Sequence, residues 1–311
     1  MAEGTKKPEF VWMDGKIIPY DQATIHVMSP AARYGTSVFE GLRAYWNEQK
    51  EELYAFRLGL HYQRLFESAK MMRLKVDYSK EDCERLFLEL LRKNHFKENI
   101  HARHVIYVGG SGPYSAREPV GMFIVALARP SGKDVEKGIH CAVSSWFRIG
   151  DNSMPPRIKA GSNYQNGRLA DLQAKEDGYD RSIMLNSNGK VSEGGGACLF
   201  MVRRGVVVTP PVTAGILESV TRATLIELFM EEMKLKVQER DIDRTELYVA
   251  EEAFFCGSGA EILPIISVDR LPVGAGIPGP ITKAVQEAYF AVVRGQKARY
   301  MDWLSPAYKK P

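Results

Sequence analysis

The sequence predicts an α+β fold divided into two domains. Strand-like and helix-like segments follow one another without the regular strand–helix–strand alternation of a parallel α/β sheet. Asp14-Gly15 and Asn188-Gly189 each separate apolar runs, as does Gly205, and such glycine turns predict antiparallel hairpins. The length of 311 residues also suggests roughly two domains.

The N-terminal half is expected to contain a hairpin at Asp14-Gly15 and a well-marked helix. Ser79 is the capping residue of that helix, with Asp82 three residues later, and apolar residues follow at helical spacing from Cys83 to Leu90. A polar segment with Pro and Gly then predicts a linker at 129–133. We therefore expect a small N-terminal domain at 1–128 and a large C-terminal domain at 134–311.

The same patterns predict the elements of the C-terminal half. Alternating apolar and polar residues indicate a half-buried strand, and capping or glycine signals mark the ends of helices. The expected elements are a strand at 139–143, a helix capped by Ser162 and ended by Gly178, hairpins at Asn188-Gly189 and Gly205, and a last helix at 281–293.

The composition excludes several classes of protein. Lys and Arg number 42 against 38 Asp and Glu, a net charge of +4, and the charges are mixed along the chain, so no nucleic-acid or membrane-surface patch is indicated. No apolar stretch approaches the ~18 residues of a membrane-spanning helix, and the N-terminus lacks the apolar core of a signal peptide. The four cysteines are not paired at metal or redox spacing. We expect a reduced, cytoplasmic protein.

Two common catalytic fingerprints, the Walker loop and the Gly-x-Ser-x-Gly elbow, are missing from the sequence. His101 and His104 precede a strand-like run, where a spacing of three places side chains on opposite faces, so no metal site is predicted. His101 and Arg103 share a face and could recognise an anion; an ordinary surface pair is the alternative.

Two further residues, Lys159 and Glu193, are candidates for binding a cofactor. Lys159 ends a strand-like approach just before a predicted helix, and an amine held there could form a Schiff base with a carbonyl cofactor. A solvated surface lysine is the alternative. Glu193 precedes three glycines, which would let the backbone approach a large flat group while the carboxylate pairs with a protonated ring nitrogen. A glycine-rich bulge is the alternative.

Two segments could bind a phosphate. Residues 217–222 open a helix, whose first N–H groups suit an anion, although a plain helix start with a solvated Arg222 is the alternative. Residues 257–259 form a small-residue turn that could donate further N–H groups. A lysine, a ring-nitrogen carboxylate and phosphate donors are together what pyridoxal phosphate requires.

With these motifs in place, the chain resembles the class IV, fold-type IV pyridoxal-phosphate aminotransferases, and among them the branched-chain amino acid aminotransferases. The motifs that carry the resemblance lie at 34–41 (YGTSVFEG), 159–164 (KAGSNY) and 193–222, which ends in LESVTR. The resemblance implies a two-domain fold like that of D-amino acid aminotransferase, with a smaller N-terminal α/β domain and a larger C-terminal domain containing a pseudo-barrel. It also implies pyridoxal 5′-phosphate as cofactor, no metal, and a homodimer or higher homo-oligomer.

The resemblance also implies residue roles. Lys159 would be the catalytic residue, which binds the cofactor and moves the substrate's proton, while Glu193 would face the pyridine nitrogen and Tyr164 the O3′ oxygen. The remaining cofactor contacts would come from Arg57, Leu217, Val220, Thr221 and Ser258. The substrate-binding residues would be Tyr34, Phe39, His101, Arg103, Gly196 and Gly259, with Arg103 on the distal carboxylate of glutamate. His101 and Cys198 depart from the family, which usually has Tyr and Asn there.

The expected function is transamination of L-leucine, L-isoleucine and L-valine with 2-oxoglutarate, which gives branched 2-oxo acids and L-glutamate. Amino acids and 2-oxo acids would be the only partners besides a second copy of the chain. A D-amino acid or (R)-amine transaminase, or an aminodeoxychorismate-type lyase, is the alternative on the same fold. A non-catalytic binding or scaffold protein is the alternative of another class.

Overall fold

The computed structural model describes residues 7–309, which divide into two compact units. The first unit takes in the described residues up to Pro130, the segment Ile158–Ser162 and the residues from Ala291 onward. The second unit consists of Ser131–Arg157 and Asn163–Phe290. The short segment around Lys159 is thus grouped with the N-terminal strands, although it lies far from them in the sequence.

The first unit is built on an antiparallel sheet of seven strands in the order β16-β4-β3-β5-β6-β1-β2. The strands are β1 Phe10–Met13, β2 Lys16–Pro19, β3 Ser37–Asn47, β4 Glu52–Phe56, β5 Ile100–Val108, β6 Val120–Ala128 and β16 Leu304–Pro306. Asp14 and Gly15 join β1 to β2 with φ angles of 45° and 90°, which confirms the predicted two-residue turn.

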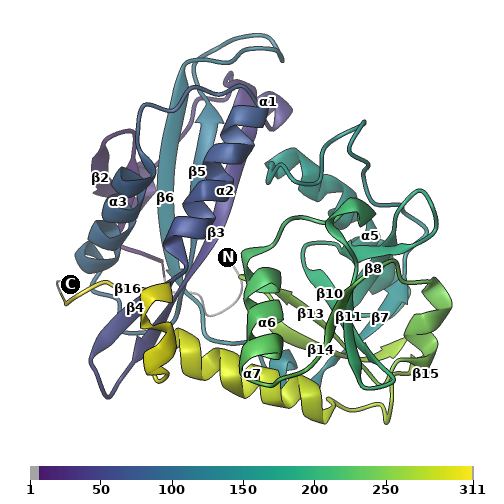
Figure 1. The fold of residues 1–311 in the computed structure, drawn as a ribbon. Helices are drawn as coiled ribbons and strands as arrows, with labels where there is room; N and C mark the ends of the chain where they lie inside the picture. Colours follow the sequence, from purple (N-terminus) through teal and green to yellow (C-terminus); the bar gives the residue numbers. More distant parts are fainter. Residues whose placement is uncertain (1–6, 310–311) are drawn as a thin grey trace. The chain divides into compact units, whose positions relative to one another are not determined.

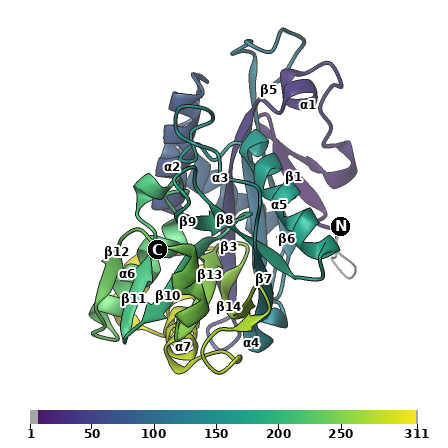
Figure 2. The ribbon, with the colours of Figure 1, turned by 90° about the vertical axis from the view of Figure 1, so that its right-hand side faces the viewer.

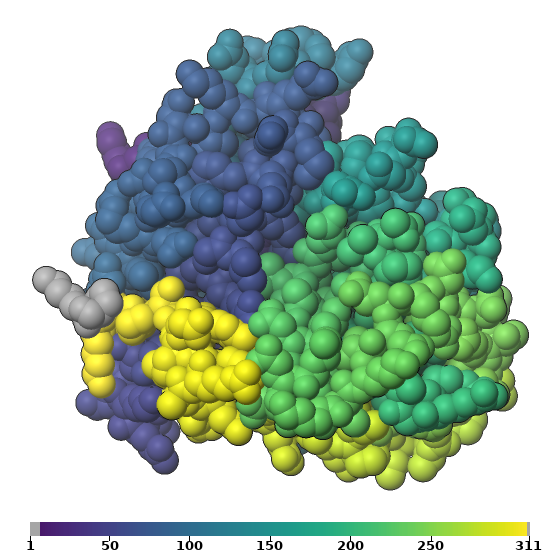
Figure 3. Space-filling model, in the orientation of Figure 1, coloured from purple at the N-terminus to yellow at the C-terminus, as the bar shows by residue number. Residues whose placement is uncertain are grey.

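Helices α2 (Leu58–Met71) and α3 (Lys80–Lys93) pack against each other and against this sheet (Figure 1). In the space-filling view their side chains lie on the side of the first unit that faces the viewer (Figure 3). Ser79 and Asp82 form the predicted capping box at the start of α3, and the apolar face from Cys83 to Leu90 is buried. The other helical segments are α1 Pro30–Tyr34, η1 Tyr20–Gln22 and η5 Ala298–Trp303.

The second unit contains a mixed sheet of nine strands in the order β12-β11-β10-β13-β14-β7-β8-β9, with β15 paired to β14 (Figures 1 and 2). The strands are β7 Ile139–Val143, β8 Arg181–Leu185, β9 Val191–Gly194, β10 Cys198–Arg203, β11 Val206–Thr209, β12 Val237–Glu239, β13 Glu252–Gly257, β14 Glu261–Val268 and β15 Leu271–Pro272. Only residues 195–197 connect the edge strand β9 to β10 in the interior of the sheet, so the sheet must curl.

Helices α5 (Tyr164–Glu176) and α6 (Val220–Glu231) pack against the strands of this sheet. The predicted cap at Ser162 is wrong: Ser162 lies inside η2 (Gly161–Asn163), which runs directly into α5, and Asn163 before the helix has a helical backbone and no side-chain cap bond. Gly178, with φ of 78°, follows the end of α5 as expected. The other helices are α4 Asp134–Lys137, η3 Val212–Ala214, η4 Arg244–Val249 and α7 Pro280–Val293, the last as predicted.

Of the two hairpins predicted in the second unit, one has the expected turn. Arg204 and Gly205 connect β10 to β11 with φ angles of 52° and 71°. Asn188 and Gly189 instead belong to a longer connection, residues 186–190, because the Asn186 side chain accepts hydrogen bonds from the N–H groups of Asn188 and Lys190. The predicted hairpin is confirmed, because β8 and β9 pair in antiparallel orientation, but its turn is not the expected two-residue turn at Asn188-Gly189.

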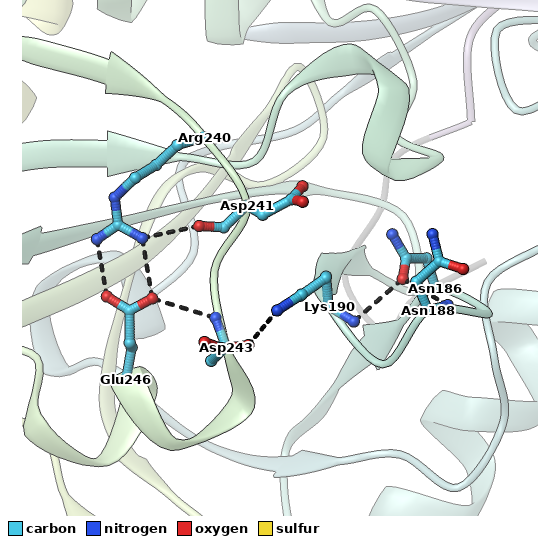
Figure 4. A network of polar contacts seen from close by, with 7 residues as sticks. All are labelled: Asn186, Asn188, Lys190, Arg240, Asp241, Asp243 and Glu246. Carbon is cyan, nitrogen blue, oxygen red and sulfur yellow. Dashed lines mark hydrogen bonds and ion pairs between the residues drawn. The ribbon is translucent and has the colours of Figure 1, made fainter.

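A network of polar contacts holds this connection, which leads into the strand that carries Glu193 (Figure 4). The Lys190 ammonium lies 2.6 Å from an Asp243 carboxylate oxygen, and Arg240 pairs with Glu246 at 2.7 Å. The N–H of Asp243 donates to the Glu246 carboxylate. These contacts fix the start of β9 against the segment that precedes η4.

The predicted α+β class is confirmed by this architecture. Among residues 7–309, no helix is both long enough and apolar enough to cross a lipid bilayer.

Candidate active site

The residues predicted to form the site fall into two groups, one in each unit. The first group contains Tyr34, Phe39, Arg57, His101, Arg103 and Lys159. The second group contains Tyr164, Glu193, Gly196, Leu217, Val220, Thr221, Ser258 and Gly259. Each group has its own geometry within its unit.

Lys159 lies on a short segment that continues the first sheet. Strand β4 pairs with β3 only from Ala44 onward, and residues 158–160 lie along the same side of the earlier part of β3. The N–H of Phe39 donates to the Lys159 carbonyl at 2.9 Å, and the Lys159 N–H donates to Ser68 Oγ at 3.1 Å. The lysine is only 8% exposed. Hydrogen bonds thus hold the Lys159 backbone through both its N–H and its carbonyl group.

The Lys159 amine and a guanidinium group both lie close to the Phe39 ring. The register of β3 and β5 pairs Gly41 with Arg103 and Phe39 with Val105, so Phe39 and Arg103 lie on one face of the sheet. The Lys159 ammonium is 5.1 Å and the Arg103 guanidinium carbon 4.8 Å from the centre of the Phe39 ring. A Cβ atom on Gly41 would lie 2.6 Å from Arg103 Nη1, so glycine makes room for this guanidinium.

His101 lies on the same face as Arg103, as predicted, and is only 8% exposed. Burial, together with the charges of Arg103, Arg129 and Arg43, lowers the pKa of His101 to about 2. Its Nε2 atom has no hydrogen-bond partner within residues 7–309. A neutral imidazole beside a guanidinium group is therefore available to hydrogen-bond a ligand.

His104 lies on the opposite face, where its Nδ1 atom is 3.1 Å from the Tyr62 hydroxyl on α2. No metal-binding cluster of His, Cys, Asp and Glu occurs in the part of the chain that the structure describes. The two histidines thus have separate environments.

Arg57 occupies an unusual backbone position. It precedes α2 with a left-handed conformation, φ 49° and ψ 42°, and its N–H donates to the carbonyl of Trp303 at 2.8 Å. Its guanidinium carbon lies 3.5 Å from the centre of the Trp303 ring. Tyr34 ends α1 and is 48% exposed. Both residues thus lie outside the strands of the sheet.

In the second unit, Glu193 is buried and paired with a cation. One carboxylate oxygen lies 2.8 Å from Arg148 Nη2, and the two side chains are 5% and 8% exposed. The other oxygen accepts hydrogen bonds from the Leu217 N–H at 3.2 Å and the Cys198 thiol at 3.6 Å. The carboxylate thus has a fixed orientation beside a permanent positive charge.

The three glycines after Glu193 have three different neighbours. A Cβ on the first, Gly194, would lie 2.8 Å from the Phe255 ring. The second, Gly195, packs so closely on α5 that a Cβ on Gly167 would lie 2.0 Å from its carbonyl oxygen. Only the third, Gly196, is exposed, and its Cβ position is 3.4 Å from the Tyr164 ring. Protein atoms therefore occupy the space beside the first two glycines.

Helix α6 begins at the predicted phosphate-binding segment. Ser219 caps it by accepting a hydrogen bond from the Arg222 N–H at 3.2 Å, so Val220 and Thr221 are its first two residues. The N–H groups of a helix's first turn have no partner within the helix and favour an anion. Ser258 and Gly259 lie in the turn between β13 and β14.

Two buried arginines, Arg148 and Arg222, have partners that the sequence does not predict. Arg148 lies in the irregular segment after β7, where its N–H donates to the Leu185 carbonyl, and no local pattern marks it as the partner of Glu193. Arg222 is 5% exposed and binds the Pro210 carbonyl at 2.8 Å and Glu239 at 2.6 Å, so the solvated arginine considered as an alternative is wrong. The contacts of Arg148 and Arg222 join residues that are far apart in the sequence, so only the folded structure shows them.

The chain is similar to known proteins over nearly its whole length. The model of the family described as amino-transferase class IV matches residues 37–268. A protein of Aquifex aeolicus named probable branched-chain-amino-acid aminotransferase is 39% identical over 306 residues, which cover 97% of this chain and 98% of the relative.

Two solved structures show the same fold. The branched-chain amino acid aminotransferase of Thermobaculum terrenum in its PLP form has a TM-score of 0.92 and 40% identity, with 97% of this chain and 99% of that chain covered. The branched-chain aminotransferase of the archaeon Thermoproteus uzoniensis with norvaline has a TM-score of 0.91 and 42% identity, with 97% and 100% covered. The resemblance drawn from the sequence motifs is thereby confirmed.

Proposed function

Because the chain belongs to the class IV amino-transferase family, we propose that it transfers the amino group of L-leucine, L-isoleucine or L-valine to 2-oxoglutarate with pyridoxal phosphate as cofactor. The products are the branched 2-oxo acids and L-glutamate. One observation carries the proposal: the Lys159 amine and the Arg103 guanidinium carbon lie 5.1 Å and 4.8 Å from the centre of one ring, that of Phe39. The names of the relatives favour this reading over a D-amino acid transaminase or a lyase.

The chemistry of the residues fits the cofactor. Pyridoxal phosphate presents an aldehyde, a ring nitrogen that can be protonated, and a phosphate. Lys159 supplies an amine for the aldehyde, and Glu193 supplies a carboxylate for the ring nitrogen. The phosphate would be held by Arg57, by Val220 and Thr221 at the start of α6, and by Ser258. Tyr164 would donate to the ring's O3′ oxygen, and Leu217 would pack on the ring.

When bound, the cofactor supplies an electron sink for the charge that develops as the Cα–H bond of the amino acid breaks. The Nζ atom of Lys159 would take the proton from Cα and return it to the cofactor carbon. Glu193, fixed by Arg148 and the Leu217 N–H, would hold a proton on the ring nitrogen. These two proton positions are the chain's catalytic contribution.

The substrate side must accept an apolar side chain in one half-reaction and a carboxylate in the other. Arg103 would bind the distal carboxylate of 2-oxoglutarate, because a carboxylate without a partner is costly to bury. His101 would add a hydrogen bond from its neutral ring. Apolar side chains would contact Phe39, with Tyr34 and Tyr164, and Gly196 and Gly259 would leave space for them.

The assay that tests this function is product formation from L-leucine and 2-oxoglutarate, with L-glutamate and the branched 2-oxo acid measured by mass spectrometry. We expect both products in equal amounts from the unaltered chain and none from Lys159→Ala. Turnover of D-alanine or aminodeoxychorismate in place of L-leucine would support the alternatives and refute the substrate assignment.

We also propose a cytoplasmic homodimer or higher homo-oligomer whose domains are bounded at 128 and 134. The assembly and the domain bounds rest on the family resemblance, and the compartment rests on the four free cysteines, since disulfides are rare in cytoplasmic proteins. Light scattering of the purified protein gives the mass of the assembly directly. A mass of one chain, 34.9 kDa, would refute the proposed dimer.

A further inference from the structure

Helix α2 turns an unusually polar face toward β3. His61, Arg64 and Ser68 lie three and four residues apart, which places them on one side of the helix. They are 2%, 8% and 0% exposed. A helix face that packs on a sheet is normally apolar, so this buried polar stripe calls for a specific explanation.

Two of these residues hold a single buried carboxylate, that of Glu40 on β3. Arg64 donates to its two oxygens from Nε at 2.7 Å and from Nη2 at 2.8 Å. His61 Nδ1 is 2.7 Å from one of the oxygens. Burial would raise the pKa of Glu40, but the charge of Arg64 and the hydrogen bond of His61 hold it well below its usual value. Burial also lowers the pKa of His61, so the trio combines one negative and one positive charge.

Such a trio, here called the clamp, contributes more to alignment than to stability. A buried ion pair recovers little more than the free energy lost in removing its charges from water. The two-pronged contact between Arg64 and Glu40, however, is satisfied in only one register of α2 on β3. The clamp therefore fixes where the helix lies along the strand.

The third residue of the stripe, Ser68, continues this alignment to Lys159. Its hydroxyl accepts the hydrogen bond from the Lys159 N–H at 3.1 Å. Phe39, the neighbour of Glu40 on β3, donates its N–H to the Lys159 carbonyl at 2.9 Å. Both contacts to the lysine's peptide thus come from the two elements that the clamp joins.

We propose that the clamp of Glu40, His61 and Arg64, acting through Ser68, positions Lys159 by its backbone and fixes its distance from Arg57 at the start of the same helix. Arg57 and Ser68 are separated by about 16 Å along the axis at the usual helical rise. The inference rests on the proposed function, in which these two residues hold the aldehyde and the phosphate of one cofactor. Ser68, Glu40 and Arg64 act as positioning residues and do not touch the substrate.

The direct test compares Ser68→Ala with the matched control Ser79→Ala. Each variant removes a serine hydroxyl that accepts a hydrogen bond from a backbone N–H in the first unit, from Lys159 in one case and from Asp82 in the other. Two properties are measured on the holoenzyme: the exchange rate of the Lys159 amide hydrogen, and the rate at which borohydride fixes pyridoxal phosphate to Lys159.

We expect Ser68→Ala to raise the amide exchange rate at least tenfold and to slow the labelling about tenfold, whereas Ser79→Ala leaves both unchanged. Equal effects of the two variants, or none in Ser68→Ala, would overturn the inference. If the unaltered chain takes no label at Lys159, the proposed function fails, but the amide exchange still tests the positioning.

The clamp itself is tested by removing both charges at once. Glu40→Gln leaves the Arg64 charge buried without its partner and destabilises the fold, whereas the pair Glu40→Leu and Arg64→Met keeps the volume. We expect this double variant to fold with its melting temperature preserved and to lose protection of the Lys159 amide. Full protection in the folded double variant would show that packing alone positions the lysine.

Discussion

Removal of the Arg148 guanidinium should destabilise the second unit strongly. Arg148→Met keeps most of the side-chain volume but leaves the Glu193 carboxylate buried without its cation. The remaining contacts of Glu193, the Leu217 N–H and the Cys198 thiol, both go to the other carboxylate oxygen. The oxygen that faced Arg148 thus loses the partner that the ion pair supplied.

The expected loss follows from the distance and the burial. At 2.8 Å, two unit charges attract by about 6 kcal/mol for an effective dielectric constant near 20. Desolvation offsets part of this energy, and removal of one partner of a buried pair typically costs about 3–5 kcal/mol. A loss of this size is a large part of the ~5–15 kcal/mol that stabilises a folded domain.

The assay is native-state hydrogen exchange of the β10 amides, because it reports the opening of this sheet separately from the rest of the chain. Arg181→Met is the control, since Arg181 pairs with Asp171 at 3.2 Å but is 51% exposed. An exposed pair contributes less than about 1 kcal/mol. A loss in Arg148→Met no larger than that in Arg181→Met would refute the reasoning.

Three further predictions follow from particular contacts. Gly167→Ala should lower the free energy of unfolding measured in urea, because an overpacking cost of about 1–3 kcal/mol against Gly195 exceeds the helix-propensity gain of about 1 kcal/mol; a stabilised variant would contradict the close packing. Burial lowers the pKa of His101 to about 2 and of His104 to about 3, so both stay neutral when folded and protonate on unfolding below about pH 6.5. The free energy of unfolding should therefore be about 3 kcal/mol lower at pH 5.5 than at pH 7.5; equal free energies of unfolding in urea at the two pH values would contradict this. Arg103→Met should raise the KM for 2-oxoglutarate roughly 10- to 100-fold, the worth of about 1.5–3 kcal/mol of charged hydrogen bonding, with the KM for leucine nearly unchanged; parallel changes in both would argue against its role.

Local signals in the sequence predicted local structure well. The Ser79 capping box and the Asp14-Gly15 turn depend on residues within four positions of each other, and both form as expected. The prediction of a cap at Ser162 failed because Ser162 itself lies in a 3-10 turn, Gly161–Asn163, that continues into α5. Here the preceding segment, and not the capping pattern, decided where the helix begins.

The sequence predicts the site residues that belong to its motifs, but not the partners of those residues. The motif around Glu193 is readable, but its partner Arg148 lies 45 positions earlier in an irregular segment, and only the fold brings the two together. Likewise, the sequence places His101 and Arg103 on one strand face, whereas the low pKa that keeps His101 neutral comes from burial and from the charges of arginines on β5, on β3 and after β6, which only the fold brings together. The surroundings of the three glycines after Glu193 could not be predicted either, since their neighbours come from α5 and β13.

The most direct test of the proposed function is the site of covalent labelling by pyridoxal phosphate and borohydride, read by mass spectrometry of the digested protein. Lys159 is buried beside the Phe39 ring and held by its backbone, so we expect a single modified lysine at this position. Labelling distributed over exposed lysines, with Lys159 unmodified, would contradict the assignment of the cofactor and of the catalytic residue together.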